Sequence, residues 1–178
     1  MADLVRRAGS GRFVDGTDVV WSVAEGQKGR RWREVRTRDG VVLSSMLLET
    51  FPDRSFAHLE LSTAAGLLTL HPEPDRTLHG NAVTSAGVRH VAGLPWPAGS
   101  VLVVDGSAVS IAAATWFASA HWGDRSQDVR MPIVTVSPAL EVRAGTIPGD
   151  GFSHEAIDAD GLPILADGNA WPLELEAP

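Results

Sequence analysis

Short segments in which apolar and polar residues alternate run through most of the chain. Val19, Trp21 and Val23, for example, fall on one side of an extended segment, as in a strand with one buried face. Turn residues such as Asp39-Gly40 separate these segments at spacings typical of antiparallel β structure. About ten or eleven strands are predicted in this way. They cover residues 18–23, 31–38, 41–51, 56–62, 67–71, 77–84, 88–94, 101–104, 131–136 and 140–143, and a final hairpin has its arms at 154–157 and 162–166.

One segment, DGSAVSIAAATWFASAHWG, breaks this pattern and predicts a helix over residues 107–122. Ser107 can cap its N-terminus, Gly123 can end it, and alanine is the strongest helix former. A helix that is apolar nearly all round is usually buried. We therefore predict a single domain over residues 1–178, mainly β, built as an antiparallel β-roll or half-barrel whose concave face is closed by this helix.

Composition narrows the class of protein. The formal net charge of −7 argues against a nucleic-acid partner. The chain has no cysteine, which excludes disulfides and thiolate metal sites and fits a cytoplasmic protein. It shows no secretory signal at the start and no apolar run of about 20 residues, so we expect no stable insertion into a membrane.

Motifs for catalysis, metals and cofactors are missing from the sequence. There is no GxSxG nucleophile motif, no HExxH metal motif and no glycine-rich phosphate loop. We accordingly assign no catalytic residue, no metal ligand and no cofactor. His79 and His90 are expected on the two arms of one hairpin, where they would face each other. A cleft containing both would indicate an enzyme of unrecognised type.

Arginines gather between residues 30 and 38. On a strand, Arg31 and Arg33 share one face, whereas Arg36 and Arg38 share the other. Their guanidinium groups could bind the phosphate or carboxylate of a head group, or could pair with carboxylates on neighbouring strands. The six tryptophans also allow two interpretations. They could line an apolar cavity, or they could belong to the ordinary core.

Several segments in order resemble a bacterial glycolipid-binding family with a spiral β-roll fold. They are the Trp21 strand, the Arg31–Arg36 strand, the Asp39-Gly40 turn, the segment Pro138–Val142 and the closing hairpin Asp158–Leu162. The central Thr-Pro-Phe-Thr-Asn segment of the family is replaced here by the alanine-rich stretch 105–123. The resemblance implies a lipid-carrier fold and a lipid-like ligand.

Together, the resemblance and the arginines favour non-covalent binding of an amphipathic or lipid-like molecule, such as a glycolipid, between sheet and helix. Candidate ligand-binding residues are Arg31, Arg33 and Arg36 for the head group and Leu43, Leu47, Leu59, Leu61, Ile111 and Trp116 for the apolar part. Two alternatives stay open. One is the enzyme with His79 and His90, and the other is a homodimeric interaction module that uses an exposed tryptophan patch or a sheet edge.

Overall fold

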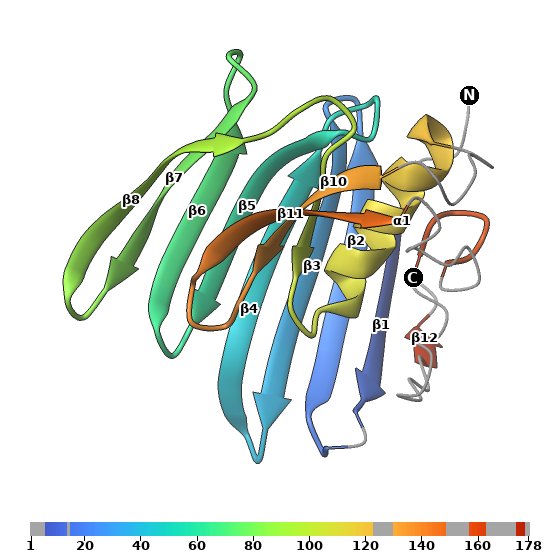
Figure 1. Cartoon of the computed structure of the whole chain (residues 1–178). Helices are drawn as coiled ribbons and strands as arrows, with labels where there is room; N and C mark the ends of the chain where they lie inside the picture. Colours follow the sequence, from blue (N-terminus) through green and yellow to red (C-terminus); the bar gives the residue numbers. More distant parts are fainter. Residues whose placement is uncertain (1–5, 14, 123–129, 149–156, 163–173, 177–178) are drawn as a thin grey trace.

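A computed structural model describes residues 6–13, 15–122, 130–148, 157–162 and 174–176. Most of them belong to one large sheet, in which each strand pairs with the next along the chain in antiparallel fashion (Figure 1). The order across this sheet is β12-β1-β2-β3-β4-β5-β6-β7-β8. Its strands are β1 (Arg6–Arg12), β2 (Asp18–Gly26), β3 (Gly29–Arg38), β4 (Val41–Thr50), β5 (Phe56–Thr63), β6 (Gly66–Pro72), β7 (Thr77–Thr84), β8 (Gly87–Pro95) and β12 (Glu174–Glu176).

A second layer covers one face of the large sheet. It consists of helix α1 (Ala108–His121) and a small sheet of order β11-β10-β9, with strands β9 (Val101–Val104), β10 (Arg130–Val136) and β11 (Val142–Pro148). Figure 1 shows α1 and the small sheet lying over the large one. The structure confirms a mainly β half-roll with one buried helix, and the two end strands of the large sheet do not pair to close a barrel.

One strand pair differs from the antiparallel prediction. β9 and β10 run parallel, with Val101 opposite Ile133 and Val104 opposite Val136. Parallel neighbours need a crossover connection, and α1 lies within the connection between these two strands. The predicted strand at 140–143 also starts later, at Val142, because Leu140 occupies a turn with a φ of 62°. Most of the predicted hairpin around 154–166 lies outside the described residues.

The core lies between the large sheet and the second layer. Alternation along the strands places one set of side chains in this core, among them Trp21, Trp32, Leu59 and Leu70, each at most 1% exposed. Burying large apolar side chains of this kind stabilises a fold by roughly 1.5–3 kcal/mol each. The other face of the same strands carries most of the exposed arginines and valines of the sheet.

Helix α1 matches its predicted bounds closely. Ser107 is the N-cap, and its hydroxyl oxygen accepts the backbone N–H of Ser110 at 3.0 Å. Val109, Ala112 and Trp116 are buried against the large sheet side of the core. Trp122 is the C-cap of the helix, and its backbone N–H donates to the carbonyl oxygen of Ala118; the predicted cap, Gly123, lies outside the described residues. No helix of the described residues has the length and hydropathy needed to cross a membrane.

Candidate functional site

A cavity of about 200 Å³ lies between the large sheet and the N-terminal end of α1. One part of its wall is apolar and the other is polar and charged. The wall is formed by Thr17, Glu34, Arg36, Arg38, Leu43, Ser44, Met46, Leu61, Thr63, Val104, Asp105, Ser107 and Pro138. Such a mixed, concave surface is typical of sites for small molecules.

Glu34 is the most buried charged group of this wall. Strand alternation places it on the same face of β3 as Trp32, and it is only 2% exposed. Its Oε2 accepts the Ser107 hydroxyl at 3.1 Å and the backbone N–H of Val109 at 3.3 Å. The first turn of a helix has free N–H groups and a partial positive charge, so a carboxylate is favoured there. No group of the described residues donates a hydrogen bond to the other oxygen, Oε1.

Burial raises the pKa of Glu34 from 4.5 to about 7. The hydrogen bond from Val109, the positive charge of Arg36 and the hydrogen bond from Ser107 act in the opposite direction, and each of them lowers this pKa. Burial has the larger effect because it removes water from the charged form of the carboxyl group. Near neutral pH the cavity wall therefore holds a carboxyl group that is present in both its acid and its ionised form.

Arg36 follows Glu34 on the same face of β3. Its guanidinium group lies 5.0 Å from the ring centroid of Phe13 and beside the backbone of Gly106, where a Cβ atom would come within 2.9 Å of Nη1. The Nε atom is buried and has no hydrogen-bond partner. Within the part of the chain that the structure describes, Arg36 forms no hydrogen bond and no ion pair with any carboxylate within 4.0 Å. A guanidinium group in this condition is an open site for an anion.

Arg38 is partly satisfied by its neighbours. Its Nη2 donates to the carboxylate of Asp15 and, at 2.8 Å, to the hydroxyl of Thr17. The Nε atom of Arg38, like that of Arg36, is buried without a partner. Asp105 adds a further carboxylate to the wall. Arg36 is therefore the arginine of this cavity that is free to bind an incoming anion.

Some of the candidate residues from the sequence meet at this cavity. Arg36, Leu43 and Leu61 line it. Leu59 and Trp116 are on the same side of the sheet, but they are packed in the core and do not reach the cavity. Three of the nine candidate residues thus lie at the cavity, and they come from β3, β4 and β5.

Four candidates lie elsewhere. Arg31, Arg33 and Leu47 point to the outer face of the large sheet, because they alternate with the buried positions of β3 and β4. Arg31 pairs there with Glu49 at 2.6 Å, so for this residue the carboxylate-pairing interpretation is correct. Ile111 is half-buried on α1 and does not line the cavity. Sequence analysis did not propose four other lining residues as ligand-binding residues: Glu34, Arg38, Thr17 and Ser107. Glu34 and Arg38 could have been found, because they are charged residues on the same face of β3 as the buried Trp32.

His79 and His90 do not face each other. The pairing of β7 with β8, which starts with Thr84 opposite Gly87, places His90 opposite Asn81, with 2.6 Å between Nδ1 and Oδ1. His79 is instead opposite His71 on the preceding strand. The described residues contain no group of three or more His, Asp or Glu side chains arranged to hold a metal ion. The hairpin of β7 and β8 is therefore formed, but it does not bring His79 and His90 together as a facing pair.

The tryptophans belong mainly to the core. Trp21, Trp32 and Trp116 are buried, and Trp96 and Trp122 are half-buried. Among the residues that the structure describes, no exposed tryptophan patch is present to support an interaction module.

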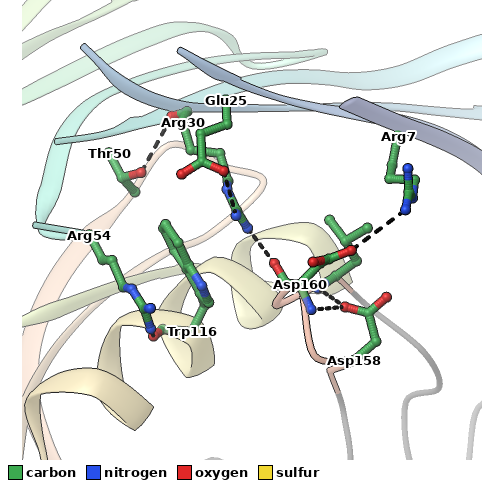
Figure 2. A network of polar contacts seen from close by, with 9 residues as sticks. Arg7, Glu25, Arg30, Thr50, Arg54, Trp116, Asp158 and Asp160 are labelled. Atoms are coloured by element: carbon green, nitrogen blue, oxygen red, sulfur yellow. Dashed lines mark hydrogen bonds and ion pairs between the residues drawn. The ribbon is translucent and has the colours of Figure 1, made fainter. Parts of the chain in front are cut away.

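A second polar network is centred on Arg30 and is shown in Figure 2. Arg30 is 3% exposed, donates to the carbonyl oxygen of Asp160 at 2.6 Å and to Glu25 at 3.1 Å, and lies 3.8 Å over the Trp116 ring. Arg54 lies 4.6 Å from the same ring and donates to the Trp116 carbonyl oxygen at 3.3 Å. These contacts tie the sheet, the helix and the turn at Asp160 together.

A second, much smaller space lies further along the sheet–helix interface. A void of about 20 Å³ lies between β4, β5 and the middle of α1, bounded by Leu48, Phe56 and Phe117 among others. This volume holds about one water molecule.

Removal of the Ser107 hydroxyl tests the link between the helix and the cavity. Ser107→Ala loses the N-cap of α1 and the hydrogen bond to Glu34, so we expect the free energy of unfolding to fall by about 1 kcal/mol. Urea denaturation checks this value. Ser137→Ala, in a turn of the second layer, is a suitable comparison, because its hydroxyl makes one long contact of 3.3 Å with the Glu141 amide. An equal loss in both variants would contradict the expectation.

Comparison of the chain with models of protein families, with curated proteins and with solved structures gives no match. The function is accordingly inferred from the geometry and chemistry of the cavity.

Proposed function

We propose that this protein binds a small amphipathic anion, non-covalently, in the cavity at the N-terminal end of α1. The observation that carries the proposal is the guanidinium group of Arg36, which lines the cavity near Glu34 but forms no hydrogen bond and no ion pair within 4.0 Å with a carboxylate of the described residues. A guanidinium group presents a planar fork of donors that fits a carboxylate or phosphate. Leu43, Met46 and Leu61 provide an apolar wall for the rest of the ligand.

The volume of the cavity sets the size of the ligand. A cavity of about 150 Å³ is large enough for benzene, so about 200 Å³ suits one ring or a short alkyl chain. Burial of such a group contributes roughly 25 cal/mol for each Å² of apolar surface removed from water. This size favours a small amphipathic molecule over a whole glycolipid, whose acyl chains would have to lie outside the cavity.

Calorimetric titration with benzoate, and with neutral benzyl alcohol of similar shape, tests the proposal at pH 6. We expect benzoate to bind and benzyl alcohol to bind more weakly. Arg36→Gln should weaken benzoate binding about thirtyfold, which is roughly 2 kcal/mol for a lost charge-assisted hydrogen bond. Arg33→Gln is the matched control, since Arg33 is on the same strand but on the outer face of the sheet.

Two results would overturn the proposal. One is the absence of benzoate binding to the unaltered protein at millimolar concentrations. The other is equal weakening by Arg36→Gln and Arg33→Gln, because that would place the anion away from the cavity. Circular dichroism of both variants shows whether the fold is retained.

A further inference from the structure

We propose that the ligand is a monocarboxylate and that it binds together with one proton, held by Glu34, whose acid form donates a hydrogen bond to the carboxylate of the ligand. This inference rests on the proposed function and extends it, because it identifies the anionic group and the condition under which the site accepts it.

The geometry of β3 supports this arrangement. Glu34 and Arg36 are two residues apart on one face of the strand, so their Cα atoms are about 7 Å apart and both side chains border the same cavity. A carboxylate group placed between them would meet the guanidinium group on one side and the Glu34 carboxyl group on the other. One free guanidinium fork matches one carboxylate.

The orientation of Glu34 leaves one oxygen for the ligand. Oε2 is held by Ser107 and by the N–H of Val109, both at the start of α1. Oε1 has no donor among the described residues. When this oxygen carries the proton it can donate to an anion, and O–H···O⁻ hydrogen bonds are among the strongest in proteins.

The charges around the cavity favour this proton. The charged groups of the lining are Glu34, Arg36 and Arg38 from β3 and Asp105 from the turn after β9, and Asp15, in the loop before β2, pairs with Arg38 beside them. The lining residues of β4 and β5 are uncharged, and among the described residues no histidine lines the cavity. With Glu34 ionised, the two carboxylates and the two arginines of the lining balance, so a further anion brings an unbalanced negative charge. With Glu34 protonated, the lining carries one positive charge in excess, which one monocarboxylate neutralises.

The ionisation of Glu34 supports the same conclusion. Burial raises the pKa of this carboxyl group to about 7, so at neutral pH little free energy is needed to protonate it. A second carboxylate brought close to it raises the pKa further, because two adjacent carboxylates cannot both ionise without a large cost. Binding of the ligand should therefore be linked to uptake of a proton from solvent.

The test is calorimetric titration with benzoate at pH 6, 7 and 8, in pairs of buffers that differ in ionisation enthalpy. Benzoate stays ionised over this range. If only the acid form of Glu34 binds, the apparent Kd should rise about tenfold from pH 6 to pH 8, because the competent fraction falls by that factor. At pH 8 close to one proton should be taken up for each benzoate bound.

Two variants test whether Glu34 is the group that takes up the proton. In Glu34→Gln, whatever its absolute Kd, we expect the Kd to be independent of pH and the proton uptake to be absent. Glu60→Gln, on the outer face of β5, should keep the pH dependence of the unaltered protein. Phenyl phosphate should bind more weakly than benzoate, since a dianion brings two charges to a site with one free guanidinium group.

The possible outcomes separate this inference from the proposed function. Benzoate binding without proton uptake, or a pH dependence that persists in Glu34→Gln, overturns the inference and leaves the anion site intact. Tighter binding of phenyl phosphate overturns the choice of a monocarboxylate. The absence of any anion binding at pH 6 overturns the proposed function itself.

Discussion

The Glu34→Gln variant is expected to be about 3 kcal/mol more stable towards unfolding than the unaltered protein at pH 8. The pKa of Glu34 is 4.5 in its ordinary state and about 7 in the fold, and each unit of difference corresponds to about 1.36 kcal/mol. Ionisation of this buried group therefore destabilises the native state. The amide oxygen of glutamine can still accept from Ser107 and Val109 without carrying a charge.

The pH dependence follows from the same difference. Between about pH 4.5 and pH 7 the native state holds a proton on Glu34 that the unfolded chain has already lost. The stability due to this group is thus fully present below pH 4.5, and it is lost as the pH rises to about 7. Above pH 7 the loss is complete and its contribution stays constant.

Urea denaturation at pH 5 and at pH 8 measures this effect without any ligand. The difference between Glu34→Gln and the unaltered protein should be small at pH 5 and grow to its full value by pH 8. Glu60→Gln serves as the control, because Glu60 is exposed on the outer face of the sheet. Parallel stability curves for the unaltered protein and Glu34→Gln would show that the carboxyl group is not perturbed.

Arg30→Ala is expected to lower the free energy of unfolding by about 3 kcal/mol. The substitution removes a side chain that is 3% exposed, and it leaves a space beside the Trp116 ring, which the guanidinium group contacts at 3.8 Å. Replacement of a large buried side chain by alanine costs about 2–5 kcal/mol. The carbonyl oxygen of Asp160 also loses its donor (Figure 2). Loss of the ion pair with Glu25 adds little, since Glu25 is 31% exposed.

Two further variants separate the causes of this loss. Arg31→Ala, one residue along on the outer face, removes only a surface pair with Glu49 and should cost less than about 0.5 kcal/mol. Arg30→Lys should lower the free energy of unfolding by an intermediate amount. An ammonium group keeps the charge, but it loses the planar contact with Trp116 and cannot donate to both Asp160 and Glu25 in the same way. Thermal denaturation of the three variants provides the comparison. Similar losses for Arg30→Ala and Arg31→Ala would mean that Arg30 does not anchor the turn.

Alternation of apolar and polar residues was enough to predict strands β2 to β8 of the large sheet, whereas β1 (RRAGSGR) lacks this alternation and was not predicted. The buried helix was predicted within one residue at each end, because Ser107 and the run of alanines act locally. The same alternation separates Arg36 and Arg38 from Arg31 and Arg33. Alternation shows which residues of β3 share a face. It does not show which of the two faces is buried, because charged residues occur on both.

The candidate site was decided by contacts between distant parts of the chain. Glu34 becomes a buried, hydrogen-bonded acid only because the N-terminus of α1, which begins at Ala108, docks over β3. The register of the large sheet places His79 opposite His71 and His90 opposite Asn81, and the parallel pairing of β9 with β10 follows from the path of the chain through α1.

The sequence by itself therefore determined the elements, their two faces and the burial of the helix, since these depend on the local period of the chain and on capping residues. Only the tertiary structure decided which charged residues share a cavity and which stay in solvent. The reason is physical: strand register and helix docking minimise the free energy of the whole core, and no single segment contains that information.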